Sequence, residues 1–466
     1  MNIRKNSRAL AEREMSAMVN VMTSRREFLA GFAAFAAMRS LPADAATREY
    51  YVKYLDAITR KIKTNAERKG ARGGFFFYAD SHVLSNHGQS GFVMADLVGR
   101  TGIGRVFGGG DYSVLYCKDD PKEAMERILK LHRECWRDPV EAAGGSFYAA
   151  KGNHDLIVFR KDSEKKSGFG YSSRHAREIL MDTAAVRRAA SNPDDGHGVY
   201  FYTDDLSAQV RYIVADTSDG VRESDCDPKG LWLGIKMRQI QLDWLRDKAF
   251  GTMPEGWRAV VMQHVPLAAV TIGRDEYIER FTPFRELMEK EAARGRMLAD
   301  LSGHHHCDRF THWRGLLHIS LSCDCHYRDA ELLTPFCGTM AGKKKGTTNE
   351  QAFDCFQPCG DLLFATRIGQ GTDRVFHVKP LEMKTGDRLR LEAKELEGPL
   401  SWTVFDADAF TEIKGPGLMG DQRCQFTRSY ASVSEKGEVS ALRPGDVTVL
   451  AMDRMFNKEI FGIRIS

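Results

Sequence analysis

The stretch Phe147-Tyr148-Ala149-Ala150-Lys151-Gly152-Asn153-His154-Asp155 is the most informative in the chain. Its first four residues are a short apolar run, which is typical of a buried strand, and a polar turn begins at Gly152. Functional side chains of α/β proteins lie just past the carboxyl ends of their strands. The turn that follows this strand is therefore a candidate for chemistry.

Further apolar runs resemble this one and are separated by helical patterns. The runs are Phe75 to Ala79, Gly102 to Phe107, Val210 to Ala215, Ala259 to Gln263 and Leu298 to Leu301. Apolar side chains recur at helical spacing over Pro121 to Trp136 and over Met237 to Phe250. Strands that alternate with helices predict an α/β architecture.

Polar turns with similar side chains follow four of these runs. They are Asp80-Ser81-His82, Gly108-Gly109-Gly110-Asp111, Gln263-His264 and Gly303-His304-His305-His306. A single Asp-x-His or Gly-Asp turn is commonly structural, but five such turns in one order indicate a site. Oxygen and nitrogen donors without thiolate suit manganese, zinc or iron. Seven candidate ligands are enough for two ions that share one carboxylate, which is a standard arrangement for displacement at phosphorus.

These motifs resemble those of the calcineurin-like metallophosphoesterase superfamily, which includes the purple acid phosphatases. The resemblance runs from about Gly73 to His377 and extends to Tyr212-Ile213-Val214-Ala215-Asp216-Thr217, Gln241-Leu242-Asp243-Trp244-Leu245 and Arg367-Ile368-Gly369. It implies a four-layer α/β/β/α sandwich with two metal ions at one edge of the central sheets. The ions would be divalent or trivalent manganese, zinc or iron.

The resemblance also implies a role for each motif residue. Asp80, His82 and His306 would hold the first metal ion, and Asp111 would bridge both ions. Asn153, His264 and His304 would complete the second. His154 would protonate the leaving oxygen or stabilise the transition state, and Asp155 would hydrogen-bond its other ring nitrogen. A hydroxide bridging the two ions would attack a phosphate ester in line.

Two positions depart from the family pattern or extend it. Purple acid phosphatases have an iron-binding tyrosine three residues after the bridging aspartate, and this chain has Val114 there, with Tyr112 and Tyr116 out of register. No purple chromophore is expected. His305 occupies the variable position of its motif and is interpreted as a wall of the pocket, with contact to substrate phosphate as the alternative.

The N-terminal segment resembles a twin-arginine export signal. Ser24-Arg25-Arg26-Glu27-Phe28-Leu29 precedes an uncharged run that ends at Met38, and Ala43-Asp44-Ala45 forms a small-x-small cleavage site. The run from 28 to 38 is 11 residues, shorter than the roughly 18 residues that span a bilayer. We expect an exported protein, periplasmic or extracellular, without a transmembrane anchor. Met22 is suspected to be the true start.

The composition is that of a globular protein and gives no nucleic-acid signal. The 466 residues are 42% hydrophobic and 28% charged, which excludes disordered and collagen-like chains. With 67 Lys and Arg against 63 Asp and Glu, the net charge is +4. Nucleic-acid-binding domains have a clustered basic face and a pI above about 9. A polyanion is therefore not the expected partner, and the resemblance to metallophosphoesterases implies a small-molecule or lipid-headgroup phosphate ester instead.

Ten cysteines are too few for a disulfide scaffold. Cys323, Cys325, Cys337, Cys355 and Cys359 cluster after the last metal motif. Disulfides are favoured here because the protein is expected to be exported. A structural zinc site is the alternative, but the spacings lack paired Cys-x-x-Cys motifs.

The chain after His377 changes character. Short alternating runs at 389–393, 401–404, 447–451 and 461–465 predict strands with no helix between them. The stretch from Gly437 to Val449 resembles a bacterial immunoglobulin-like group 2 domain, and such modules serve as spacers or contact cell surfaces. We expect a small all-β sandwich over 378–466, a catalytic domain over 46–377 and a signal peptide over 1–45.

The sequence thus predicts an exported dinuclear-metal phosphoesterase, with phosphate monoesters as the favoured substrates. Two alternatives stay open. The protein acts as a phosphodiesterase on nucleotides or phospholipid headgroups, or it is a non-catalytic surface-binding protein with a relict phosphoesterase body. The presence of all seven ligand positions counts against the second alternative.

Overall fold

The structure is a computed structural model that describes residues 45–82, 89–113, 116–117, 120–155, 157–160, 168–170, 176–196, 198–220, 224–225, 235–267, 280–324, 348–349, 351–412 and 424–466. The chain divides into two compact units. The smaller comprises Met1–Ala57 and Gly346–Thr348, and the larger comprises Ile58–Lys345 and Asn349–Ser466. Helix α3 (Ala45–Ala66) begins in the smaller unit. The signal peptide predicted over 1–45 lies almost entirely outside the described residues.

The first large sheet of the larger unit has ten described strands in the order β20-β25-β26-β17-β16-β15-β1-β2-β4, with β18 paired to β26. Strands β1, β2 and β4 are parallel, and β15 runs antiparallel to β1. The bounds are β1 (Phe75–Tyr78), β2 (Arg105–Gly108), β4 (Ser146–Ala149), β15 (Ala352–Cys359), β16 (Leu362–Gly369), β17 (Arg374–His377), β18 (Leu381–Met383), β20 (Ser401–Asp406), β25 (Gly445–Met452) and β26 (Lys458–Ile465). The three parallel strands are the ones that precede the first three polar turns.

The second large sheet has seven described strands in the order β13-β14-β12-β11-β9-β8-β7. Its four central strands, β9, β11, β12 and β14, are parallel to one another. The bounds are β7 (Ala190–Ser191), β8 (Phe201–Asp205), β9 (Val210–Val214), β11 (Arg258–Met262), β12 (Met297–Ser302), β13 (Arg309–Trp313) and β14 (Leu316–Ser320). Aromatic side chains join the two sheets, since Tyr212 of β9 contacts Phe75 and Phe107 with ring centroids 5.1 and 5.2 Å apart.

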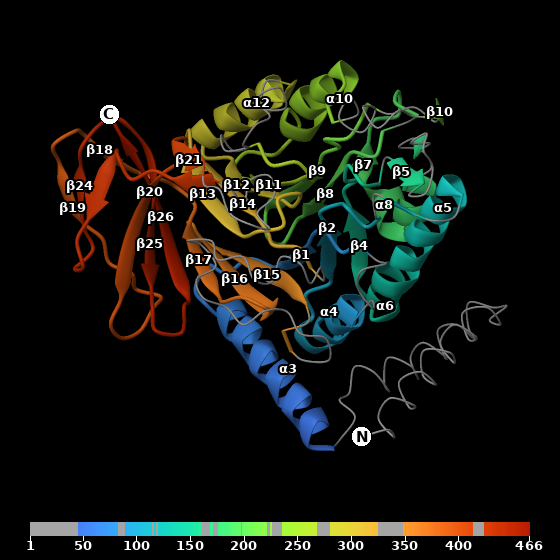
Figure 1. Cartoon of the computed structure of the whole chain (residues 1–466), viewed down its shortest axis with the longest axis horizontal. Helices are drawn as coiled ribbons and strands as arrows, with labels where there is room; N and C mark the ends of the chain where they lie inside the picture. The colour runs from blue at the N-terminus through green and yellow to red at the C-terminus, as the bar shows by residue number, and fades with distance from the viewer. Residues whose placement is uncertain are drawn as a thin grey trace. The chain divides into compact units, whose positions relative to one another are not determined.

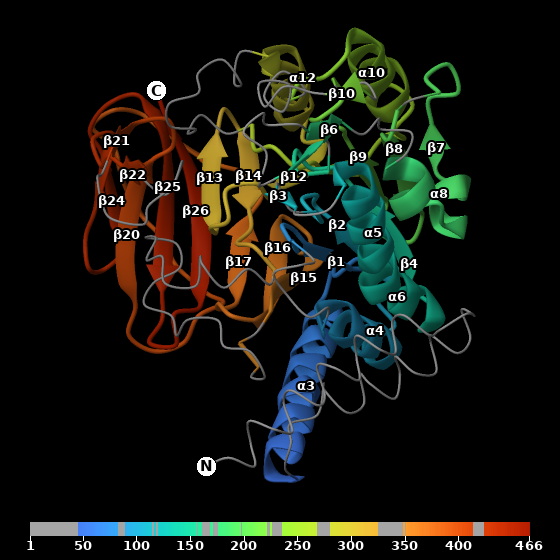
Figure 2. The same cartoon turned by 45° about the vertical axis from the view of Figure 1, so that its right-hand side comes forward.

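Helices cover the outer face of each sheet (Figures 1 and 2). Trp244, Leu245, Phe284 and Met288 of the helices after β9 and β11 pack into one core with residues of the second sheet. On the other side Trp136 stacks on Tyr78 of β1, with centroids 6.4 Å apart. The helices are α4 (Gln89–Thr101), α5 (Pro121–His132), η1 (Arg133–Arg137), α6 (Asp138–Ala142), η2 (Arg177–Met181), α8 (Ala184–Arg188), α10 (Gln239–Trp244), η3 (Leu245–Phe250) and α12 (Thr282–Ala293). The predicted four-layer α/β/β/α arrangement is confirmed.

The strands predicted after His377 are present, and three of the four, β20, β25 and β26, continue the first large sheet. β26 pairs in parallel with β17, so the last strand of the chain lies beside the strand that ends at the predicted boundary. Smaller sheets complete the all-β part: β19 (Arg388–Arg390), β23 (Ala431–Val433) and β24 (Glu438–Ala441), and the pair β21 (Phe410–Glu412) and β22 (Cys424–Phe426). Elsewhere, β3 (Tyr116–Cys117), β5 (Ile157–Arg160), β6 (Gly168–Gly170) and β10 (Ser224–Asp225) form a four-stranded sheet.

The prediction of disulfides fails for two cysteines of β15. Cys355 and Cys359 carry free thiols, and burial raises the pKa of Cys355 well above its usual value. Alternate residues of a strand share a face, so positions 355 and 359 point the same way along β15 without meeting. Cys325 and Cys337 lie outside the described residues.

Within the part of the chain that the structure describes, no helix combines the length and the apolar character needed to cross a membrane.

Candidate metal centre

Five loops converge where the strands of the two sheets end. Asp80 and His82 follow β1, Asp111 follows β2, and Asn153 and His154 follow β4. His264 follows β11, and His304 and His306 follow β12. Parallel strands end at the same edge of their sheet, so each sheet delivers its loops to one place. All seven predicted ligands and His154 are brought together there.

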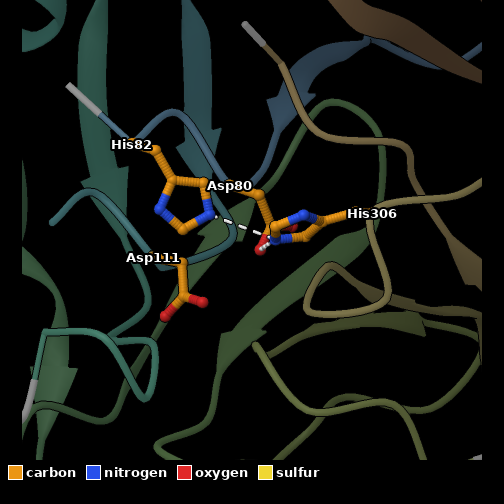
Figure 3. A group of neighbouring side chains, drawn as sticks. All are labelled: Asp80, His82, Asp111 and His306. Atoms are coloured by element: carbon orange, nitrogen blue, oxygen red, sulfur yellow. Dashed lines mark hydrogen bonds and ion pairs between the residues drawn. The ribbon is translucent and has the colours of Figure 1, made fainter. Parts of the chain in front are cut away.

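The first group of ligand atoms comes from Asp80, His82, Asp111 and His306, and these atoms lie within 4.8 Å of one another. Figure 3 shows the rings of His82 and His306 directed at each other beside the Asp80 carboxylate. The two Nε2 atoms are 3.1 Å apart, and His306 Nε2 is 3.3 Å from Asp80 Oδ1. This is the set predicted for the first metal ion together with the bridging carboxylate.

The second group shares Asp111 with the first and adds His264 and His304. His264 Nε2 lies 3.2 Å from Asp111 Oδ2. The side-chain oxygen of Asn153 lies 2.9 Å from His264 Nε2 and 2.7 Å from His304 Nδ1. The predicted set for the second ion is therefore assembled as well, with Asp111 positioned to bridge.

Backbone carbonyls orient two of the imidazole rings. His82 Nδ1 donates to the carbonyl oxygen of Ser113 at 2.7 Å, and His264 Nδ1 donates to that of Gly109 at 2.8 Å. A carbonyl oxygen only accepts, so Nδ1 carries a proton and Nε2 faces the other ligands. Ligating histidines usually have such a partner on the other nitrogen. No sequence pattern identifies these acceptors, because they are main-chain atoms.

Most of the candidate ligands have strained backbones. Eight described non-glycine residues have positive φ, and five of them are Asp80, His82, Asp111, His304 and His306, with φ between 40° and 70°. Such conformations cost of order 1–3 kcal/mol each and persist only where surrounding structure enforces them. The fold therefore spends stability to aim these side chains at a common point.

Glycine at position 110 is required by the close approach of three loops. Gly110 has φ of +92°, and a Cβ there would lie 2.7 Å from the nitrogen of Gly152 and 2.8 Å from His264 Nδ1. Any side chain would displace His264 or the loop that carries Asn153. The Gly-Gly-Gly-Asp motif thus serves packing as well as ligand placement.

The two carboxylates among the candidate ligands, Asp80 and Asp111, are ionised, whereas burial and the Asp111 charge raise the pKa of Asp155 to about 7. Burial opposes ionisation of Asp111, but His154 and His264 outweigh it and hold its pKa well below the usual range. The same balance, with His306 as the main neighbour, lowers the pKa of Asp80. Burial and the nearby His306 lower the pKa of His82 to about 3, so this imidazole is neutral. Ionised carboxylates and neutral imidazoles are the protonation states that bind cations.

His264 differs from the other histidines. Burial alone would lower its pKa, but the Asp111 carboxylate beside it raises the pKa to about 9. At neutral pH His264 therefore keeps a proton on Nε2, facing Asp111. A cation bound to this nitrogen would take the place of that proton.

His154 lies over the bridging carboxylate. Its Nε2 is 3.7 Å from Asp111 Oδ2, and its backbone nitrogen donates to Asp111 Oδ1 at 2.7 Å. Burial lowers the pKa of His154, although Asp111 opposes the shift. A neutral imidazole still has one N–H to donate. His154 is partly exposed, with 24% of its side chain accessible, so it can meet a substrate oxygen; His304 and His306 are partly exposed as well.

The predicted hydrogen bond between Asp155 and the ring of His154 is absent. Among the described residues, Nδ1 of His154 has no hydrogen-bond partner. Asp155 instead accepts from the backbone nitrogens of Asp111, Tyr112, Ser113 and Gly152 at 2.9 to 3.0 Å. Both of its oxygens are occupied by the loop that carries Asp111. Asp155 thus holds the bridging ligand in place and does not orient His154.

Two further positions flagged from the sequence have clear places. The Tyr112 hydroxyl donates to the Ala150 carbonyl at 2.8 Å, so this tyrosine points into the core and not toward the metal ligands. His305 is buried beside His304, with ring centroids 5.6 Å apart. Val114 lies outside the described residues.

The donor set fits two cations. It consists of carboxylate and amide oxygens and imidazole nitrogens, which suit manganese, zinc or iron. No described cysteine belongs to either ligand group.

Comparison with known proteins gives structural likenesses only. No protein-family model and no curated protein matches the chain. Among solved structures it is similar to a dimetal phosphatase from Danio rerio, at 13% identity and a TM-score of 0.44, over 66% of this chain and 99% of that one. It is also similar to the GAP50 anchor of the inner membrane complex of Plasmodium, at 11% identity and a TM-score of 0.40, over 66% and 89%.

A predicted phosphoesterase from Streptococcus pneumoniae is similar at 11% identity and a TM-score of 0.24, over 66% of this chain and 98% of that one.

Proposed function

We propose that the protein is a metal-dependent phosphoric ester hydrolase of the calcineurin-like metallophosphoesterase superfamily. One observation carries the proposal: two groups of buried ligand atoms share the single carboxylate of Asp111. Shared carboxylates are typical of two-metal sites that act on phosphorus. Two bound cations would supply Lewis-acid stabilisation of the phosphoryl oxygens and an acidified water as the nucleophile.

The chain's own residues would do the rest. Asp111 supplies one negative charge between the two positions, and Asn153 contributes a neutral oxygen to one of them. His154 presents its ring to the open side of the site, where it can donate to a phosphoryl or leaving-group oxygen. Asp155 keeps Asp111 fixed while the charge on the substrate redistributes.

Turnover of two chromogenic substrates tests the proposal. Chelator-treated protein reloaded with Mn²⁺ or Zn²⁺ is assayed on a nitrophenyl monoester and a bis-nitrophenyl diester, beside Asn153→Ala and His154→Ala. General acid–base groups contribute about 10²–10⁴ in rate, so His154→Ala should lose activity on this scale. His377→Gln, whose ring contacts Glu459 far along the sheet, is the matched histidine control and should keep full activity.

The outcomes separate the alternatives. We propose phosphate monoesters as substrates, and a higher rate on the diester would assign a phosphodiesterase instead. Wild-type protein with two bound ions and no turnover on a broad phosphoester panel would refute the enzyme and favour a surface-binding protein. Fewer than two ions per chain would refute the dinuclear centre.

We also propose that the protein is exported by the twin-arginine route, on the strength of Arg25-Arg26 and the cleavage site at Ala43-Asp44-Ala45. Fractionation of cells that express the full chain should find the processed protein outside the cytoplasm. Replacing both arginines by lysine should retain it inside. Unchanged distribution of this variant would refute the route.

A further inference from the structure

Four buried charged side chains form a cluster beside the loop that carries the candidate ligand His306. Asp308, Asp354, Arg367 and Arg374, here called the four-charge cluster, are each at most 3% exposed. Asp354, Arg367 and Arg374 belong to β15, β16 and β17, and Asp308 lies two residues after the candidate ligand His306. The cluster therefore joins three strands of the first sheet to the loop that follows β12 of the second.

The geometry of the cluster is well defined. Arg367 Nη2 donates to both oxygens of Asp308, at 2.9 and 3.0 Å. The same guanidinium donates to Asp354 through Nε at 2.9 Å and Nη2 at 3.1 Å. Arg374 contacts both carboxylates from the other side, with Nη1 3.4 Å from Asp308. Each of the two guanidinium groups thus contacts both carboxylates.

Stability alone does not explain this arrangement. A buried ion cluster costs several kcal/mol of desolvation per ion, and replacing it by apolar side chains is often neutral or stabilising. Its rigidity is the property that side chains of other kinds would not reproduce, because the guanidinium fork fixes the carboxylates in direction as well as distance. This rigidity suits the cluster to fix the positions of the atoms that it contacts.

The cluster is connected to two of the four candidate ligands of the first metal position, His306 and Asp80. Asp308 fixes the chain just past His306, and it accepts from the backbone nitrogen of Ser322 at 2.8 Å. The next residue, Cys323, directs its thiol at the backbone oxygen of Asp80 at 3.3 Å. Arg367 adds a contact to the Ser322 hydroxyl at 3.3 Å. The backbones of Asp80 and His306, which both have positive φ, are thus both connected to the four-charge cluster.

The second metal position has different supports. His264 is held by the carbonyl of Gly109, and the Asn153 loop by Asp155 through Gly152. Within the described part of the chain, the hydrogen bonds and ion pairs of the four-charge cluster do not include these groups. The two positions therefore have largely separate supports. They share Asp111, and the backbone nitrogen of His304 in the second position donates to the Asp80 carboxylate of the first at 2.9 Å.

We propose that Asp308 and Arg367 are positioning residues that set the metal affinity of the first position, formed by Asp80, His82, Asp111 and His306, and leave the second unaffected. The inference rests on the metal centre of the proposed function but not on its catalysis. Loss of a partner behind a metal ligand typically costs about 10–100-fold in metal affinity. We expect that loss at one of two positions only.

Calorimetric titration of chelator-treated protein with Mn²⁺ alone tests the proposal. Wild-type protein should bind two ions, and Arg367→Lys and Asp308→Asn should weaken one binding step by about 10–100-fold. In a His264→Ala background, which retains the first position, Arg367→Lys should weaken the remaining ion. In a His82→Ala background, which retains the second, it should change nothing. Arg367→Lys keeps the charge, so it carries the test if Asp308→Asn does not fold.

A matched control separates positioning from general stability. Arg137 forms a buried pair with Asp138 at 2.6 Å and also faces Glu141. Arg137→Lys should lower the unfolding temperature but leave both Mn²⁺ affinities unchanged. Equal affinities in wild-type protein and Arg367→Lys would overturn the inference, and so would equal weakening of both positions. Selective weakening without phosphoester turnover would uphold the inference and refute the proposed enzyme. Wild-type protein that binds no Mn²⁺ would refute both.

Discussion

Protonation of His312 should destabilise the protein steeply in mild acid. His312 lies in β13, is 1% exposed, and packs against Gly462 of β26, where a Cβ would collide with its ring. Its backbone nitrogen donates to the Thr448 hydroxyl of β25 at 3.0 Å. Burial, with the nearby His318 and His377, lowers the pKa of His312 to about 3. The ring therefore stays neutral where the last strands meet the second sheet.

The sign and size of the effect follow from linkage. Between pH 6.5 and about 3 the unfolded chain carries a proton on this histidine and the folded chain does not, so stability falls as the pH falls. Each unit of pKa difference is worth about 1.4 kcal/mol. Acidification from pH 6.5 to pH 4 should therefore remove about 3 kcal/mol of unfolding free energy through His312 alone.

Urea unfolding of the chelator-treated protein at several pH values between 7 and 4 measures this term, with tryptophan fluorescence as the probe. His312→Gln cannot titrate, so its unfolding free energy should vary less with pH, by about 1.4 kcal/mol per unit. The comparison uses slopes, which removes the packing change of the substitution. Parallel profiles for wild-type protein and His312→Gln would refute the reasoning.

Four other outcomes are expected. Asp155→Asn should lower the unfolding free energy by about 2 kcal/mol or more in urea unfolding. Burial and the Asp111 carboxylate raise the pKa of Asp155 to about 7, but an amide cannot accept all four backbone hydrogen bonds, and each buried donor left without an acceptor costs about 1–3 kcal/mol. A stable variant impaired only in kcat would restore the role of orienting His154. Gly110→Ala should weaken Mn²⁺ binding at the second position in calorimetry, because its Cβ would lie 2.8 Å from His264 Nδ1; unaltered affinity would contradict the packing argument. Mn²⁺ binding at that position should strengthen as the pH rises toward about 9, because His264 must lose its proton to bind the ion. At pH 7 the binding should release this proton, which calorimetry detects as a binding heat that depends on the buffer. Heats independent of the buffer would exclude this. A chain that stops after His377 should be insoluble, or unfolded by circular dichroism, because it exposes the edge of β17 that pairs with β26. A soluble, folded and active fragment would show that the all-β part is a separate module.

The sequence was sufficient for the strands and for the polar turns that follow them. Strands such as β1 and β12 are short runs in which every residue is buried, so the apolar pattern alone marks them. The ligands could be predicted because parallel strands bring their carboxyl ends to one edge, and this rule needs no knowledge of the loops.

Contacts between distant segments could not be predicted in the same way. Three of the four partners of Asp155 are backbone nitrogens of a loop more than forty residues earlier, and a backbone donor has no sequence signature. Asp155 next to His154 suggested a side-chain pair, but the turn directs the carboxylate away from the ring. Similarly, the alternating pattern after His377 identified strands but not their neighbours, since pairing of β26 with β17 leaves no trace in either segment.

Asp308 was missed although a signal for it was present. From the sequence, Arg367 stands out only as part of a family-like stretch, yet an arginine inside a largely apolar run, Leu362–Gly369, must be paired once the strand is buried. Its partner had to be a carboxylate elsewhere in the core. Asp308, directly after the histidine motif, is such a residue.

The backbone gives evidence for the site that does not depend on the motifs. Strained φ values arise where surrounding contacts overrule local preference, and they cluster at functional positions. Here five of the eight such residues that the structure describes are candidate ligands. Their conformations are enforced by separate devices: Asp155 for the Asp111 loop, and the four-charge cluster for His306 and Asp80. Each device buries charge, which costs stability and serves no packing purpose that apolar side chains could not meet. The common product of strain and buried charge is a fixed arrangement of oxygen and nitrogen atoms around Asp111, and two cations are the occupants that such an arrangement fits.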